Sequence, residues 1–127
     1  VPCYDFSTHT RVLGDHCIMN PSSVVIVEGI LLFTDPRICG LLDLRVFVET
    51  AADERILRRI QRDVDERGRS VASVMEQYLT TVKPMHAMYV EPSRMEADLV
   101  VNGGRDLSKA VDLIVAHANA QLGASPA

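Results

Sequence analysis

Cysteine and histidine are scarce in this sequence and are not spaced as metal ligands. Its three cysteines are odd in number and include no C-x-x-C pair, and its four histidines include no H-x-x-x-H pair. This pattern argues against a disulfide framework and against a zinc site. Such cysteine usage is typical of a reducing compartment, so we expect a cytoplasmic protein.

Long apolar runs and an excess of positive charge are also lacking. No apolar run reaches the roughly 20 residues that a transmembrane helix needs, and the first residues show no signal-peptide pattern. The formal net charge is −4, whereas non-specific binding to nucleic acid requires a basic surface that neutralises phosphates. The sequence therefore predicts that neither a membrane nor a nucleic acid is a partner.

The motifs that bind phosphate or activate a nucleophile in many enzymes are missing. The only lysines are Lys83 and Lys109, and neither follows a glycine, so no G-x-x-x-x-G-K-[ST] loop is present. No G-x-G-x-x-G fingerprint or G-x-S-x-G elbow occurs either. Candidate chemistry must therefore be sought in other residues.

Hydrophobic patterning predicts strands that alternate with helices. Val24 to Val27 is a continuous β-branched run, typical of a strand buried on both faces of a parallel sheet. The expected strands are residues 24–27, 43–48 and 99–101, and helical spacing begins near Asp53, Ser70 and Asp106. This order indicates an α/β fold with a parallel sheet. The 127 residues fit a single domain with a sizeable core, and we expect residues 123–127 to form a disordered tail.

Glu28 and Gly29 come directly after the first expected strand. Ligands of open parallel sheets gather at the carboxyl ends of the strands, where a carboxylate can hold Mg²⁺, usually through water. The alternative is a solvated acid at the end of a strand, followed by a glycine in a tight turn. Position alone leaves both interpretations open.

Arginines are concentrated in the middle of the chain, at Arg55, Arg58, Arg59, Arg62, Arg67 and Arg69. The forked guanidinium binds phosphate oxygens with two hydrogen bonds, so a helix that carries several of them could grip a polyphosphate. The alternative is a solvated helix of ion pairs, because acids such as Glu54 and Asp63 are interleaved with the arginines. Gly68 interrupts the pattern at a point where a mobile lid could hinge.

Aromatic side chains and a histidine lie close together near the N-terminus, where residues 4–11 read YDFSTHTR. Such side chains can stack on a planar base and hydrogen-bond to its edge. Alternatively, the aromatic rings fill the core while the histidine bonds to the backbone. The segment alone does not decide between these interpretations.

Taken in order, these segments resemble the uridine kinase family. Residues 4–11 are similar to its Y-D-F-x-x-H-x-R loop, residues 24–33 (VVIVEGILLF) to its strand with a Glu-Gly pair, and residues 58–69 to its R-R-x-x-R-D…E-R-G-R lid. The match continues through residues 77–78 (QY), 82–86 (VKPMH), 90–93 (VEPS) and 97–98 (AD). The resemblance implies a parallel-sheet P-loop NTPase fold of the nucleoside kinase type, with residues 1–127 as the C-terminal part of its domain.

The resemblance also implies an activity and a set of site residues. The activity is phosphorylation of uridine or cytidine to UMP or CMP in pyrimidine salvage, with ATP or GTP as donor and with Mg²⁺. The implied substrate-binding residues are Tyr4, Phe6, His9, Ile30, Arg59, Arg69 and Gln77. Arg62 and Arg67 would act as catalytic lid residues on the triphosphate, where positive charge stabilises the transferred group. Glu28 would position Mg²⁺ through water.

The resemblance further implies that the fold is incomplete in these residues. In the family, the P-loop, the general-base aspartate and a ribose-binding acid lie upstream of the matched segments. The strand before the P-loop separates the strands expected at 24–27 and 44–48, so its removal would leave unpaired backbone and exposed apolar faces. We therefore expect the chain to be inactive alone, and either to associate with an upstream segment or to form a homo-oligomer.

Two other functions remain open. A neighbouring kinase, such as phosphoribulokinase or pantothenate kinase, is disfavoured by the Y-D-F…H and K-P-M-H segments. A non-catalytic, degenerate kinase module that binds a nucleotide or a partner subunit would explain the missing P-loop. The sequence encoded upstream distinguishes this module from the enzyme, because the enzyme requires a G-x-x-x-x-G-K-[ST] loop there.

Overall fold

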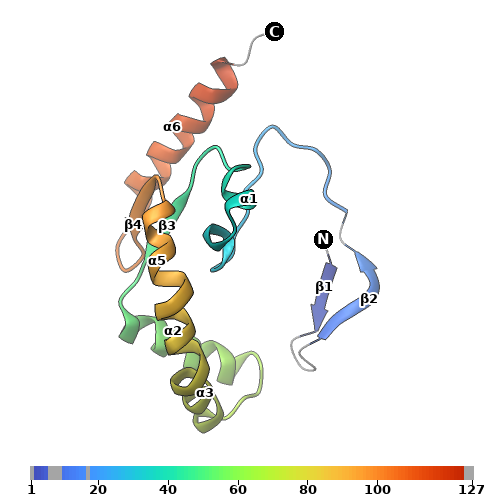
Figure 1. Ribbon diagram of the computed structural model, residues 1–127, viewed down its shortest axis with the longest axis vertical. Coiled ribbons are helices and arrows are strands. Elements are labelled where there is room, and N and C mark those ends of the chain that lie inside the picture. Colours follow the sequence, from blue (N-terminus) through green and yellow to red (C-terminus); the bar gives the residue numbers. More distant parts are fainter. Residues whose placement is uncertain (1, 6–9, 17, 125–127) are drawn as a thin grey trace.

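The computed structural model describes residues 2–5, 10–16 and 18–124. In chain order the elements are β1 (Pro2–Asp5), β2 (Thr10–His16), η1 (Leu32–Thr34), α1 (Pro36–Cys39), β3 (Val46–Glu49), α2 (Ala52–Asp65), α3 (Val71–Gln77), η2 (Tyr78–Val82), α4 (Lys83–Met85), η3 (His86–Val90), α5 (Glu91–Ser93), η4 (Arg94–Glu96), β4 (Leu99–Asn102) and α6 (Ser108–Ala124). Figure 1 shows the antiparallel β1–β2 hairpin standing apart from the helices. An extended segment, residues 18–31, connects it to the rest of the chain, and we refer to this segment as the arm.

A two-stranded parallel sheet lies at the centre of the remaining structure. β3 pairs with β4, so that Val46 lies opposite Leu99. Arg45 sets the start of this register, because its backbone N–H and its guanidinium donate to the carboxylate of Asp98 at 2.8 to 3.1 Å. Helices connect the two strands, as a parallel pair requires. The expected α/β class with a parallel sheet is therefore confirmed, although the sheet is small.

Gly103 lets the loop after β4 lie directly against the end of β3. A Cβ atom at this position would lie 2.5 Å from Thr50 Oγ1 and 2.8 Å from Val48 Cγ1. The N–H of Gly103 also donates to the carbonyl oxygen of Glu49 at 2.7 Å. Glycine fits here because a Cβ atom would force the side chains of Thr50 and Val48, or the strand ends themselves, to shift.

Residues 71–96 form one continuous helical run that contains two π-helical turns. Each π-helical turn, η2 and η3, precedes a proline, at Pro84 and Pro92 respectively. Proline has no N–H, and its ring clashes with the carbonyl four residues earlier, so the preceding turn widens. The run begins where expected, because the Ser70 side chain accepts a hydrogen bond from the N–H of Ser73 at 3.2 Å.

The prediction of a strand at Val24–Val27 is wrong for this structure. These residues have no strand partner in the described part of the chain, and their side chains are exposed, from 47% for Val24 to 88% for Ile26. A strand that is buried on both faces needs neighbours on either side and covering layers. β3 pairs with β4 and not with the arm, so these requirements are not met. The strand expected at 43–48 begins later, at Val46, whereas the one expected at 99–101 is confirmed as β4.

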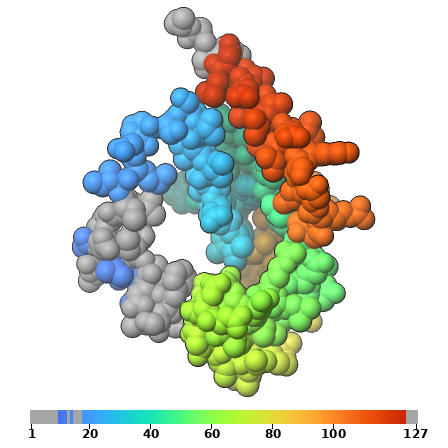
Figure 2. Space-filling view, turned by 180° about the vertical axis from the view of Figure 1, so that it is seen from behind, coloured from blue at the N-terminus to red at the C-terminus, as the bar shows by residue number. Residues whose placement is uncertain are grey.

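The apolar core is smaller than the chain length led us to expect. Among the described residues, the buried apolar side chains are Val74, Val90 and Val101. The accessible surface is 10051 Å², against about 6,700 Å² for a compact protein of 14.0 kDa. Figure 2 shows an opening between the arm and the helices. No helix in the described ranges is both long and apolar enough to cross a membrane.

Candidate functional site

Helix α2 and the turn after it bring together the arginines that the sequence singles out. Gly68 has a φ of +62°, a conformation that favours glycine, and it reverses the chain after α2. The N–H of Arg69 then donates back to the carbonyl oxygen of Asp63 at 3.0 Å. In Figure 1, α2 and α3 lie side by side at the bottom of the view. The arginine cluster, as we define it, consists of Arg59, Arg62, Arg67 and Arg69 around Asp63.

The carboxylate of Asp63 lies at the centre of the arginine cluster and is 0% exposed. Its Oδ1 accepts hydrogen bonds from the Arg62 guanidinium at 2.8 and 3.0 Å and from Arg67 Nη1 at 3.1 Å. Its Oδ2 lies 3.4 Å from Arg69 Nη1 and 3.7 Å from Arg59 Nε. Four cations thus surround one anion, which leaves the cluster with a net charge of +3.

Opposing effects act on the pKa of Asp63. Burial raises the pKa, whereas the hydrogen bond from Arg62 and the positive charges of Arg62, Arg59 and Arg67 lower it. The lowering effects prevail, so the pKa of Asp63 lies below its ordinary value of 3.8. The carboxylate is therefore ionised at neutral pH. A buried anion without partners would be costly, and the surrounding guanidinium groups offset that cost.

Gln77 joins two of these arginines from the neighbouring helix α3. Its Oε1 accepts a hydrogen bond from Arg69 Nη1 at 2.7 Å and another from Arg59 Nη2 at 2.9 Å. Arg69 also donates from Nη2 to Ser73 Oγ at 2.9 Å. These bonds connect α2, the turn at Gly68 and α3 into one polar network.

The arginine cluster keeps part of its cationic surface accessible. The side chains of Arg62 and Arg67 are 45% and 32% exposed, whereas those of Arg59 and Arg69 are 24% and 21% exposed. Each guanidinium has five N–H donors, more than one carboxylate can accept. Guanidinium groups that are already held in place and carry a net positive charge are suited to bind an anion such as a phosphate group.

The alternative of a solvated, ion-paired helix describes the outer face of α2. Arg58 pairs with Glu54 at 3.3 Å, and both side chains are largely exposed, at 61% and 45%. Arg55 points elsewhere, because its Nε donates to the carbonyl oxygen of Thr50 at 3.0 Å. Arg55 and Arg58 therefore lie outside the arginine cluster.

The other predicted site residues lie outside the arginine cluster or outside the described residues. Tyr4 belongs to strand β1, and Phe6 and His9 fall outside the described residues. Glu28 and Ile30 lie in the arm, where both are exposed. Of the predicted residues, the structure joins the four arginines and Gln77 in one network.

Glu28 is the residue that we expected to position Mg²⁺. The described residues contain no group of three His, Cys, Asp or Glu side chains that could hold a metal ion. Magnesium, however, commonly takes one or two carboxylates and completes its shell with phosphate oxygens and water. A single exposed carboxylate such as that of Glu28 fits one position of such a shell.

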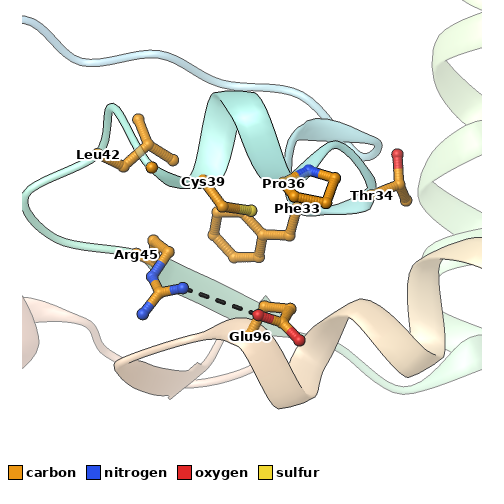
Figure 3. Close-up of a pocket in the computed structure, with 8 residues that line it drawn as sticks. Phe33, Thr34, Pro36, Cys39, Leu42, Arg45 and Glu96 are labelled. Carbon is orange, nitrogen blue, oxygen red and sulfur yellow. Dashed lines mark ion pairs between the residues drawn. The ribbon is translucent and has the colours of Figure 1, made fainter.

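A hollow of about 670 Å³ lies between α1 and the residues that precede β3 and β4, and none of its lining residues belongs to the arginine cluster. It is lined by Phe33, Thr34, Pro36, Cys39, Gly40, Leu42, Arg45 and Glu96. Figure 3 shows Phe33 and Cys39 on one wall and the ion pair between Arg45 and Glu96, at 3.8 Å, on the other. Because Arg45 is also bonded to Asp98, the hollow lacks the surplus of cations that the arginine cluster has.

Sequence reasoning missed the central role of Asp63, which it treated as one of the interleaved acids. Asp63 lies four residues after Arg59 on α2, so helical geometry places these two side chains on one face, and Arg67 follows four residues later in the turn after the helix. That spacing was the available signal. Burial of the carboxylate depends on α3, which the spacing does not reveal.

The structure is thus an α/β protein with a small parallel sheet and a cluster of four arginines that carries a net positive charge. Residues 1–109 match the model of the Phosphoribulokinase / Uridine kinase family, and the chain belongs to this family. The resemblance inferred from the ordered segments is thereby confirmed.

Proteins named uridine kinase are close relatives. The one from Clostridium perfringens (strain SM101 / Type A) is 48% identical over 122 residues, which cover 96% of this chain and 58% of the relative. The one from Bacillus mycoides (strain KBAB4) is 48% identical over 115 residues, which cover 90% of this chain and 53% of the relative. The chain therefore spans a little more than half the length of these relatives.

Proposed function

We propose that this chain is part of a kinase that phosphorylates uridine or cytidine to UMP or CMP, with ATP or GTP as the donor. The arginine cluster carries the proposal, because it holds four guanidinium groups around a buried carboxylate in a chain related to uridine kinases. Phosphoryl transfer spreads negative charge over the transferred group and the donor phosphates. Fixed positive charge at that point lowers the barrier.

The four arginines divide into two roles in this proposal. Arg62 and Arg67, the more exposed pair, contact the triphosphate and stabilise the transferred phosphoryl group. Arg59 and Arg69 contact the nucleoside, and Gln77, which bonds to both, contacts it with them. The first pair acts as catalytic residues, whereas the second orients the acceptor.

The remaining substrate contacts come from the N-terminal residues. Tyr4, Phe6 and His9 bind the pyrimidine base, and Ile30 lines the nucleoside site. Glu28 supplies one carboxylate to the magnesium shell, through water. The chemistry that Mg²⁺ would supply there is neutralisation of part of the negative charge of the donor phosphates. Support for these roles is the ordered match of the segments to a family that the chain belongs to.

A working kinase of this kind also needs a phosphate-binding loop. No G-x-x-x-x-G-K-[ST] motif occurs in the 127 residues, and the relatives are longer than the matched region. We infer that another segment of the full-length gene product supplies the loop and the general base. This chain alone is then inactive, and its exposed apolar surface is covered by that segment or by another copy of the protein.

The test is a coupled ATP-to-ADP assay on the full-length gene product. We expect turnover with uridine and cytidine, but none with ribulose 5-phosphate or pantothenate. Turnover with either of the last two alone would indicate a neighbouring kinase. Nucleotide binding without turnover on any acceptor would indicate a non-catalytic module.

Two single variants test the proposed catalytic arginines in the same assay. Arg62→Ala and Arg67→Ala are each expected to lower kcat on the order of 10²-fold, because each removes a donor to developing charge. The matched control is Arg58→Ala on the same helix, where the arginine is exposed and pairs with Glu54. A loss of kcat in the control as large as in the two variants would contradict the assignment.

A further inference from the structure

The two oxygens of Asp63 divide the arginine cluster into two pairs. Oδ1 bonds to Arg62 and Arg67, whereas Oδ2 lies beside Arg59 and Arg69. These are the same pairs that the proposed function assigns to the triphosphate and to the nucleoside. The carboxylate therefore stands between two groups of cations with different expected ligands.

We propose that Asp63 is a positioning residue that sets the triphosphate-binding arginines and the nucleoside-binding arginines relative to each other. The inference rests on the proposed function for the identity of the two ligands. It does not require Asp63 to touch either substrate, because the carboxylate is fully buried beneath the arginines.

Electrostatics explains why the arginine cluster needs an anion at this position. Like charges repel, so guanidinium groups gathered at the end of one helix would move apart into solvent without a counter-charge. A flexible arginine also loses rotamer freedom when it is fixed, and this loss costs free energy. Bonds to Asp63 fix the side chains before substrate binds, so less of that cost falls on the binding step.

The two pairs are not held equally well, and this asymmetry makes the proposal testable. Arg59 and Arg69 have a second shared anchor in the Oε1 of Gln77. Arg62 donates from both Nε and Nη2 to the same atom, Oδ1 of Asp63. Loss of the Asp63 charge should therefore release Arg62 while Gln77 still holds the other pair.

The experiment compares Asp63→Asn and Gln77→Leu in the full-length gene product, with kcat and KM measured for both substrates. For Asp63→Asn we expect kcat to fall by about tenfold or more and the KM for ATP to rise more than the KM for uridine. For Gln77→Leu we expect the reverse split, with the larger rise in the KM for uridine. Glu54→Gln, which alters the exposed pair with Arg58, is the control and should stay within about twofold of wild type.

Several results would overturn the positioning role. Equal rises in both KM values for Asp63→Asn, together with a lower Tm, would mean that Asp63 only maintains the fold of the lid. Wild-type kinetics in Asp63→Asn would mean that the arginines need no carboxylate. If Asp63→Asn does not fold, Asp63→Glu tests the position of the carboxylate in its place, because it keeps the charge but moves both oxygens by one methylene; unchanged kcat and KM values in that variant would overturn the positioning role.

A binding measurement separates this inference from the proposed function. If the wild-type protein has no kinase activity on uridine, the proposed function fails. The affinity of each variant for ATP, without an acceptor, is then measured by calorimetry. Weaker ATP binding in Asp63→Asn than in Glu54→Gln would still support Asp63 as the residue that positions Arg62. Equal ATP affinities in the two variants would overturn it.

Discussion

The arginine cluster and the arm differ in where their partners come from. The hydrogen bonds and ion pairs described above for the cluster join residues at most 18 positions apart, the longest being the bond from Arg59 to Gln77. These contacts come from one helix, the turn after it and the next helix. The arm contains the stronger strand signal, Val24–Val27, yet these residues are exposed and unpaired with any described strand. A local charge network forms from local sequence, whereas a central parallel strand needs neighbours from distant segments.

The β3–β4 pair shows that sequence distance alone does not explain why the arginine cluster forms and the arm stays unpaired. Arg45 and Asp98 are 53 positions apart, but their bonds set the register of a regular parallel pair. Both strands and the helices between them are present in this chain. The arm therefore lacks neighbouring strands rather than strand propensity, and the following changes test that view.

The largest effect is expected from Ile26→Asp in the full-length gene product. If another segment completes the sheet around the arm, the new carboxylate is buried without a partner, at a cost of about 3 kcal/mol or more. The free energy of unfolding in urea measures the change. Ile18→Asp is the control, because Ile18 is 89% exposed and lies outside the expected strand. Equal, small effects of the two substitutions would mean that the arm stays exposed in the full-length protein.

Gly103→Ala tests the contact between the ends of β3 and β4. Its Cβ atom would lie 2.5 Å from Thr50 Oγ1, so the Thr50 side chain or the strand ends must shift, which we expect to cost about 1–3 kcal/mol. Thermal unfolding measures the loss. Gly123→Ala in α6 has open space around it and should be neutral or stabilising. A neutral result for Gly103→Ala would show that this junction is looser than the structure indicates.

Gly68→Ala tests whether the arginine cluster depends on the turn after α2. No atom would contact the new Cβ, so the cost comes from the φ of +62° and should be about 1 kcal/mol. Because Arg69 follows directly, we also expect a higher KM for uridine in the full-length gene product. Unchanged stability and unchanged KM would argue that the turn does not position Arg69.

The smallest effect concerns the pH dependence of stability at His86. Burial lowers its pKa below the ordinary 6.5, the charge of Arg55 lowers it further, and Glu91 partly opposes both. Below pH 6.5 the unfolded chain takes up a proton more readily than the folded chain, so stability decreases as the pH falls from 6.5 toward the lower folded pKa. His86→Gln should flatten this part of the curve, measured by urea midpoints between pH 7 and 5. A curve as steep as that of wild type would assign the slope to other groups.

Much of the fold and part of the site could be predicted from sequence patterns. The start of α3 at Ser70, the turn at Gly68 and strand β4 follow from capping, backbone conformation and hydrophobic pattern. Each of these depends on a few consecutive residues. The arginines of the cluster and Gln77 were also singled out, although their contacts were not.

The sequence by itself determined the family, the chain order of most elements and the residue types available for binding an anion. Only the tertiary structure decided that the carboxylate of Asp63 is buried, that its two oxygens divide four arginines into pairs, and that Gln77 supports one pair. It also decided that Val24–Val27 remains exposed. The physical reason is that burial, ion pairing and strand pairing are properties of atoms brought together from separate elements, which a local pattern does not specify.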